Sequence, residues 1–221
     1  VLGCNGSGKT TLLHALAGLA PVRGTVAIDG RPLESFARRE LGRTLGILLQ
    51  REDEPFWGSV RDYVMLGRYP HARSLFGAGA DDEAACERAL AQFDLAALDD
   101  HAYLTLSGGE RQRARLAQLW AQQPSLMLLD EPLQHLDLKH QLRTLELIRA
   151  AASESGDGVA LVLHDLQYAH RCDRILMLYG DGRYAAGTTA QLLQPAMLSD
   201  LYGCGIRECG HGADAHFVPV I

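Results

Sequence analysis

The sequence has no hydrophobic run long enough to cross a membrane as a helix. Its apolar stretches, such as the one over residues 126–129, are far shorter than the ~20 residues that a bilayer requires. Cysteine is scarce and odd in number, with five residues and no paired framework. This composition excludes a disulfide-stabilised secreted scaffold and fits a reducing compartment such as the cytoplasm.

Positive charge is also in short supply. The chain has 21 basic and 27 acidic residues, a net charge of -6, and its arginines are scattered rather than gathered in a stripe. A dedicated nucleic-acid binder usually carries a basic excess or stripe, so no nucleic-acid partner is expected. What is present is an ordinary globular composition, 47% hydrophobic and 22% charged over 221 residues. A chain of this length can bury roughly 70% of its unfolded surface without disulfides or a structural metal.

Apolar runs alternate with amphipathic segments along the chain. Strands are expected over residues 44–49, 126–130, 159–163 and 175–178, with shorter ones over 24–28 and 183–185. Helices are expected over residues 9–19, 59–66, 82–93, 108–122, 139–151 and 166–170. The alternation predicts an α/β fold with a largely parallel sheet. Residues 51–122 have helical patterns and no convincing strand, so they are expected to form a helical subdomain, while Asp29-Gly30 and Asp181-Gly182 predict hairpin turns.

The start of the chain has the pattern of a phosphate-binding loop. Residues 3–10 match G-x-x-x-x-G-K-S/T and lead into a helical pattern. The glycines let successive N–H groups face one anion, Lys9 supplies a positive charge, and Thr10 offers a hydroxyl to Mg²⁺. An ordinary glycine-rich turn before a helix is the alternative, and it leaves the Lys-Thr pair unexplained. The predicted ATP-binding residues are Gly3, Cys4, Asn5, Gly6, Ser7, Gly8, Lys9, Thr10 and Thr11.

Two further motifs suit the same chemistry. The apolar strand over residues 126–130 ends in Asp130, which can hold Mg²⁺ through water, and Glu131, which can orient or deprotonate an attacking water. Taken alone, two solvated acids at a turn explain this pair equally well. Residues 106–112 read LSGGERQ, in which Ser107 and Glu110 form a capping box. Gly108 and Gly109 leave the first turn bare, so a second helix end is suited to an anion.

In order and spacing, these motifs resemble those of ABC-type ATPases over nearly the whole chain. They are GCNGSGKTT, Gln50 after a strand, LSGGERQR, LMLLDE, HLD at 135–137 and His164. The resemblance implies a P-loop ATPase with a parallel-sheet core, one nucleotide-binding domain over residues 1–221, and the cofactors ATP and Mg²⁺. It implies that Thr10, Gln50 and Asp130 contact Mg²⁺, that Glu131 is the general base, and that His164 contacts the γ-phosphate. It also implies that Asp137 is the acid of the dimer loop. The residues that would contact the ATP of the partner subunit are Ser107, Gly108, Gly109 and Glu110.

The segment over residues 60–71 ends in Gly-Arg-Tyr-Pro-His and, with residues 195–203, resembles importers of ferric siderophores, haem and cobalamin. Cobalamin is slightly favoured. The implied partners are a second ATPase subunit, transmembrane permease subunits and, indirectly, a periplasmic or surface substrate-binding protein, at the cytoplasmic face of a bacterial plasma membrane. A soluble ABC ATPase of DNA repair or translation is the main alternative, but the chain lacks room for a coiled-coil insert or a tandem unit. A small-metabolite kinase with a P-loop has no use for LSGGERQR.

Three features depart from the family pattern. Only Val1 and Leu2 precede the phosphate loop, where the family has further strands and an adenine-stacking aromatic, so N-terminal strands are expected to be missing from this chain. Trp120 occupies an unusual place on the signature helix. The tail offers four soft metal ligands, but their spacing fits no strong zinc pattern and a glycine-rich surface hairpin is expected there instead. These ligands are Cys204, Cys209, His211 and His216.

Overall fold

The computed structural model describes residues 1–50, 55–72, 79–154, 156, 158–163, 165–210 and 216–220. The chain divides into two compact units, and each is described by itself. The larger unit is His14–Leu161, and the smaller unit joins Val1–Leu13 to Val162–Ile221. Within the described residues, no helix combines the length and the apolar character needed to cross a membrane.

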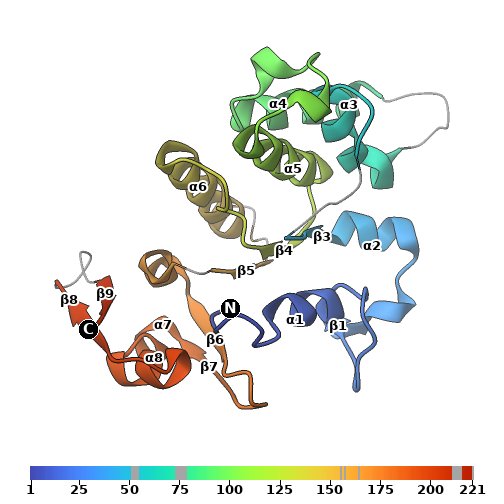
Figure 1. Ribbon diagram of the computed structural model, residues 1–221. Coiled ribbons are helices and arrows are strands. Elements are labelled where there is room, and N and C mark those ends of the chain that lie inside the picture. The colour runs from blue at the N-terminus through green and yellow to red at the C-terminus, as the bar shows by residue number, and fades with distance from the viewer. Residues whose placement is uncertain are drawn as a thin grey trace. The chain divides into compact units, whose positions relative to one another are not determined.

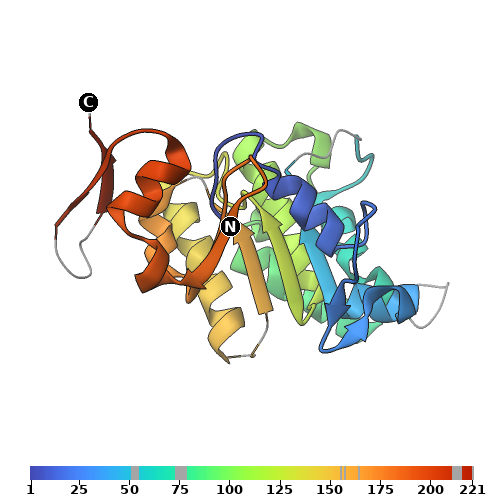
Figure 2. The same ribbon diagram turned by 90° about the horizontal axis from the view of Figure 1, so that it is seen from below.

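The larger unit is built on buried parallel strands. β3 (Leu45–Leu48) pairs with β4 (Leu126–Asp130), so that Leu45 lies opposite Leu126, and β5 (Gly158–Val162) is the next neighbour of β4 (Figure 2). Most side chains of β3 and β4 are buried, as in a parallel sheet covered on both faces. The two strands match the sequence prediction, and their parallel pairing brings their carboxyl ends to one edge of the sheet.

Each named element that the structure describes between β3 and β4 is helical. They are α3 (Val60–Met65), η2 (Leu66–His71), α4 (Ala80–Gln92), η3 (Ala96–Leu98), η4 (Tyr103–Thr105) and α5 (Gly108–Gln122). α3, α4 and α5 lie together (Figure 1), and their fully buried side chains include Val60, Val64, Cys86, Leu116 and Leu119. α6 (Leu138–Glu154) follows β4. The described elements of residues 51–122 are therefore helical, and a separate helical subdomain stays a prediction from the sequence.

The smaller unit contains the phosphate loop and the end of the chain. β6 (Arg174–Leu178) pairs antiparallel with β7 (Tyr184–Thr188), and Leu2 forms a parallel bridge to Met177. The Leu2 N–H donates to the Leu176 carbonyl at 2.8 Å, so an extended segment held by a strand leads into the loop. The remaining elements are η5 (Leu166–Arg171), α7 (Thr189–Leu192), α8 (Pro195–Tyr202), and the antiparallel strands β8 (Ile206–Cys209) and β9 (His216–Pro219).

Both Asp-Gly signals lie in hairpins. Asp29 and Gly30, with φ of 50° and 78°, join β1 (Ala27–Ile28) to β2 (Arg31–Pro32) in a two-residue turn. Asp181-Gly182 lies in the turn between β6 and β7.

Several local predictions were wrong in extent or kind. The strand expected over residues 24–28 is only β1, and the helix expected over 166–170 is the 3₁₀ segment η5. α1 spans Lys9–Leu16 and so ends before residue 19, since Gly18 is left-handed. Neither α2 (Arg38–Thr44) nor η1 (Leu33–Ser35) was predicted. α2 has no buried residue, so it lacks the apolar stripe on which a helix prediction depends.

Candidate functional site

The predicted phosphate loop wraps around the side chain of Lys9. Its ammonium is buried and donates to the carbonyl oxygens of Gly3 and Cys4, both at 2.8 Å. Gly6 and Gly8 adopt φ of 78° and 95°, a left-handed conformation that favours glycine. A Cβ on Gly3 would lie only 2.5 Å from the Leu178 carbonyl oxygen. The glycines of the motif are therefore required by backbone conformation and by close packing against β6.

The loop also presents groups that suit an anion. The hydroxyl oxygen of Ser7 is buried and has no hydrogen-bond partner among the described residues. α1 begins at Lys9, so its N-terminal N–H groups and the positive end of its dipole belong to the same loop. An unsatisfied hydroxyl, an ammonium and a helix N-terminus together fit the oxygens of a polyphosphate. Thr10 and Thr11 lie in the first turn of α1, where the sequence placed them.

Gln50 and Glu131 come together at the carboxyl ends of β3 and β4. The side-chain amide of Gln50 donates to Glu131 Oε2 at 3.1 Å. Asp130 and Glu131 are 2% and 8% exposed, so both carboxylates are almost fully buried. Glu131 has a φ of 51°, an uncommon conformation for a residue other than glycine, and such strain is frequent at functional sites. The larger unit thus unites two of the predicted site residues in one contact.

Two buried polar residues of α5 hold the loops that carry these groups. The Gln112 amide donates to the Pro132 carbonyl at 3.0 Å, just after Glu131. The Arg115 guanidinium donates to the Leu49 carbonyl, just before Gln50, and to Gln112 Oε1 at 3.1 Å. Sequence reasoning missed both. The available signal was their spacing with Leu116 and Leu119, which puts two polar residues on an apolar helix face.

The start of α5 has the predicted capping box. Ser107 accepts from the Glu110 N–H, while its own N–H and hydroxyl donate to Glu110 Oε2 at 2.8 and 2.6 Å. These hydrogen bonds, first the hydroxyl and then the N–H, lower the pKa of Glu110. Ser107 and Gly108 are exposed, and a Cβ on Gly108 would meet nothing within 4 Å. The helix N-terminus is therefore bare and accessible.

Gly109 has a different function from its neighbour. A Cβ at this position would lie 2.9 Å from the backbone oxygen of His135. The signature helix consequently packs against the loop that follows Asp130 and Glu131, and Gly109 is needed for that approach. Only Gly108 is left open toward the surroundings.

The last two predicted site residues have different outcomes. Asp137 Oδ1 accepts from the His140 N–H at 2.9 Å and lies 2.8 Å from His140 Nδ1. These two contacts lower the pKa of Asp137 and tie it to the first turn of α6. His164 lies outside the described residues. Its role thus stays a prediction from the sequence.

The Gly-Arg-Tyr-Pro-His segment anchors η2 to the end of the signature helix. The buried Arg68 donates to the Ala121 carbonyl at 2.7 Å and to the Asp82 carboxylate at 2.9 Å. His71 Nε2 lies 2.8 Å from the Gln122 carbonyl oxygen. The motif is therefore more than a helix stop, because it binds the unpaired carbonyls at the carboxyl end of α5.

The tail is the hairpin that the sequence favoured. Cys209 and His216 are opposite each other on β8 and β9, Cys204 is exposed, and His211 lies outside the described residues. His170 stacks on Phe217 with ring centroids 5.2 Å apart. In the part of the chain that the structure describes, no three His, Cys, Asp or Glu residues gather as a metal site would require.

Comparisons with known proteins agree with the motifs. The ABC transporter family profile matches residues 1–134. The hemin import ATP-binding protein HmuV of Bordetella avium is 40% identical over 224 residues, which cover 97% of this chain and 85% of that protein. The ferric enterobactin transport ATP-binding protein FepC of Escherichia coli is 37% identical over 205 residues, covering 92% and 76%.

Two solved structures share the fold. One, described as a metal-chelate type ABC transporter in an inward-facing conformation, has a TM-score of 0.83 at 28% identity and covers 100% of this chain and 84% of its own. The dimeric ATP-binding cassette MJ0796 with ADP and Pi has a TM-score of 0.72 at 26% identity, covering 83% and 82%. With the phosphate loop, the Gln50–Glu131 pair and the capped signature helix, these matches show that the chain belongs to the ABC transporter family, as an ATP-binding and ATP-hydrolysing subunit.

Proposed function

We propose that this chain drives a bacterial importer of a chelated metal, with haem as the first candidate substrate and ferric siderophores as the second. The support is that the relatives above are named for hemin and ferric enterobactin, while the anchored Gly-Arg-Tyr-Pro-His segment is intact. The slight sequence preference for cobalamin gains no support from these names. Neither does the alternative of an ATPase in DNA repair or translation.

ATP binds on the phosphate loop of the smaller unit in this proposal. The Lys9 ammonium leaves the carbonyls of Gly3 and Cys4 for the β- and γ-phosphates, and the Ser7 hydroxyl gains a partner. Mg²⁺, when bound, neutralises charge on these phosphates. It usually takes few protein ligands and keeps waters, so one carboxylate with two neutral oxygens suffices. Asp130, Thr10 and the side-chain carbonyl oxygen of Gln50 would hold the Mg²⁺ ion. Gln50 would use this oxygen, since its side-chain amide nitrogen already donates to Glu131.

Glu131 acts as the general base. Its hydrogen bond from Gln50 fixes the direction of the carboxylate, and the Gln112 contact to Pro132 fixes the backbone that follows. Water attacks the γ-phosphorus in line with the bond to the β-phosphate oxygen. The water proton passes to Glu131, the bond to ADP breaks, and phosphate leaves. Because Glu131 is buried away from bulk water, the orientation of its carboxylate matters more for catalysis than its exposure.

The bare start of α5 serves a second copy of the chain. Ser107 is capped by Glu110, and Gly108 offers its N–H on an open surface, so the helix N-terminus can meet the γ-phosphate bound by the partner. A homodimer then has two ATP sites, each completed by both subunits, with His164 and Asp137 in their predicted supporting roles. Opening after hydrolysis moves the attached membrane subunits.

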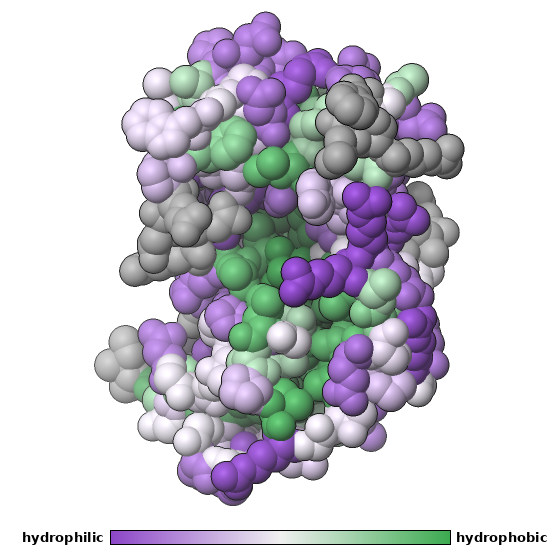
Figure 3. Space-filling model, turned by 90° about the vertical axis from the view of Figure 1, so that its right-hand side faces the viewer, coloured by the Kyte–Doolittle hydropathy of each residue, from purple (hydrophilic) through white to green (hydrophobic). Residues whose placement is uncertain are grey.

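Exposed apolar side chains near α3 and η2 support contact with permease subunits. Trp57 and Tyr69 are 84% and 72% exposed, and Leu66 between them is also exposed. Single exposed apolar groups are ordinary, but three within one short segment mark a candidate interface. Figure 3 shows hydrophobic residues exposed among polar ones on one face of the molecule; Trp57 and Tyr69 are not part of its green surface, because the hydropathy scale places both aromatic residues on the polar side. This contact would hold the chain at the cytoplasmic side of the membrane, with a substrate-binding protein engaged only through the permease.

The Gln50–Glu131 pair, together with the capped, bare signature helix, carries the ATPase part of the proposal, and the names of the relatives carry the substrate class. The test is to co-express the chain with the permease subunits of a haem importer, reconstitute the complex in lipid vesicles, and measure ATP-dependent uptake. Haem uptake that disappears in Glu131→Gln supports the proposal. Failure of the chain to co-purify with any membrane protein would contradict the transport role, and uptake of cobalamin alone would contradict the substrate class.

A further inference from the structure

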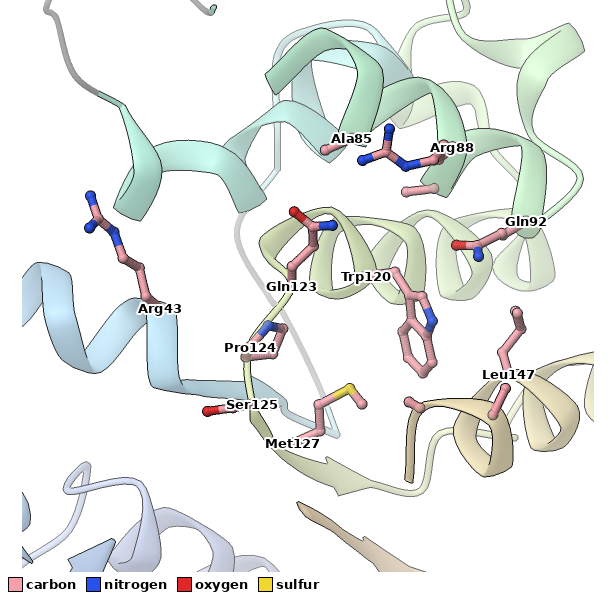
Figure 4. Close-up of a pocket in the computed structure, with 13 residues that line it drawn as sticks. Arg43, Ala85, Arg88, Gln92, Trp120, Gln123, Pro124, Ser125, Met127 and Leu147 are labelled. Atoms are coloured by element: carbon pink, nitrogen blue, oxygen red, sulfur yellow. The ribbon is translucent and has the colours of Figure 1, made fainter. Parts of the chain in front are cut away.

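A cavity of about 390 Å³ opens in the larger unit between α4, α5, the start of β4 and α6 (Figure 4). Its volume is within the usual range for small-molecule sites. No step of the ATPase mechanism uses it. Its wall includes Trp120, the residue in an unusual place on the signature helix, together with Met127, Leu147, Arg43 and Arg88.

The body of the cavity is apolar. Trp120 projects from α5 toward Leu147 of α6, with Met127 of β4 below it (Figure 4). The Trp120 ring is held at its edge by Phe93, with ring centroids 5.2 Å apart and planes at 74°. Met127 and Leu147 line the cavity and are buried residues of the core. A flat or chain-like apolar group can therefore lie against an indole ring that is already oriented.

The rim of the cavity is cationic. Arg43 and Arg88 line it, whereas no Asp or Glu does, in a protein whose net charge is -6. Arg88 is exposed, and its guanidinium has no hydrogen bond or ion pair with any described residue. Among the described residues, Arg43 contacts the Pro70 carbonyl, to which its Nε donates at 2.9 Å. Figure 4 shows Arg88 on α4 above the apolar wall, whereas Arg43 lies apart from it on α2. A guanidinium group above an apolar wall is complementary to an anionic group on an apolar body.

We propose that this cavity binds a small amphiphilic carboxylate. The carboxylate pairs with Arg88, and the apolar body lies against Trp120, Met127 and Leu147. Such a ligand touches α5, which begins at the signature, and β4, which ends at Asp130. It would therefore join α5 to the sheet. The proposal does not depend on which substrate is transported.

Phenylbutyrate and its uncharged amide, phenylbutanamide, test the proposal by isothermal titration calorimetry. The acid should bind and the amide should bind at least about tenfold more weakly, because the amide loses the charge-assisted hydrogen bond to Arg88. In a Trp57→Phe background Trp120 is the one remaining indole, so the acid should also change its fluorescence. Arg88→Gln should weaken binding of the acid about tenfold and leave binding of the amide unchanged.

The matched control is Arg39→Gln, an exposed arginine of α2 that does not line the cavity. It removes the same charge and should leave the affinity unchanged. Trp120→Phe tests the apolar wall with a milder change than alanine and should weaken acid and amide alike. The proposal is overturned if the acid does not bind, if the amide binds equally well, or if Arg39→Gln and Arg88→Gln have equal effects.

Discussion

At the scale of single residues, two buried arginines hold the larger unit together in the same way. Arg68 and Arg115 each donate to a backbone carbonyl from a distant segment, Ala121 for the first and Leu49 for the second. Burying a guanidinium is costly unless its donors are satisfied, so both residues specify one arrangement of the loops that they bind. Arg68 also pairs with Asp82. Burial alone raises the pKa of that carboxyl, but hydrogen bonds from Arg68 and the Gly79 N–H lower it overall.

Arg68→Met should lower the free energy of unfolding by roughly 3–5 kcal/mol, because it leaves Asp82 and a helix-end carbonyl without their buried donor. Urea denaturation measures this, with Arg39→Met as an exposed control that should change stability by less than about 0.5 kcal/mol. An equal loss in both variants would show that Arg68 is not a special anchor.

Asp82 gives this ion pair a predictable pH dependence. Its pKa is lower in the folded protein than in the unfolded chain, so its stabilising contribution is complete above the unfolded value of about 3.9 and is lost as the pH falls through the folded value. Asp82→Asn should therefore be much less stable than the native protein at neutral pH, and the difference should shrink below about pH 4. A difference that stays constant down to pH 2–3 would contradict the assignment.

At the scale of elements, α5 connects the parts of the site. Its first turn is the bare signature, its middle holds the loops after β3 and β4 through Arg115 and Gln112, and its end is bound by Arg68. The bounds of α5 and β4 were predictable from the sequence because each has a clear apolar period and an end signal. α2 was not, because no side chain of that helix is buried.

Those parts of the site that depend on local motifs were predictable from the sequence. Glycine spacing, the Lys9 position and the Ser107–Glu110 box depend on neighbours in sequence, and all three have the expected local geometry. The spacing of Gln112 and Arg115 on an apolar helix face marks them as unusual, but their partners lie 20 and 66 residues away and no local pattern identifies those partners. The direction of the Gln50 amide toward Glu131 likewise depends on strand pairing.

The two signature glycines should respond differently to alanine. Gly108→Ala has space for its Cβ and should keep stability or raise it by up to about 1 kcal/mol, since alanine favours helices. It should nevertheless lower ATP turnover strongly, because the added methyl covers the helix end that faces the partner's ATP in the proposed dimer. Gly109→Ala meets the His135 oxygen and should lower stability as well. Thermal unfolding and ATPase assays of both variants separate the effects, and full activity in Gly108→Ala would contradict the proposed role.

At the scale of the whole molecule, the groups needed for hydrolysis are divided. The phosphate loop belongs to the smaller unit, while Gln50, Glu131 and the signature belong to the larger one. In the proposed dimer the signature serves the ATP of the other copy. The central claim is therefore that neither copy completes a site alone, and two lesions in separate motifs can test it.

The most direct measurement is the ATPase rate of heterodimers that carry Lys9→Ala and Ser107→Arg, assembled with the membrane subunits and isolated through two different affinity tags. With both changes in one copy, each of the two sites loses one essential part, and turnover should fall close to zero. With one change in each copy, both lesions meet in one site and the other site is intact, so clear activity should remain. The reverse order, or equal rates in the two arrangements, would contradict a site shared between subunits.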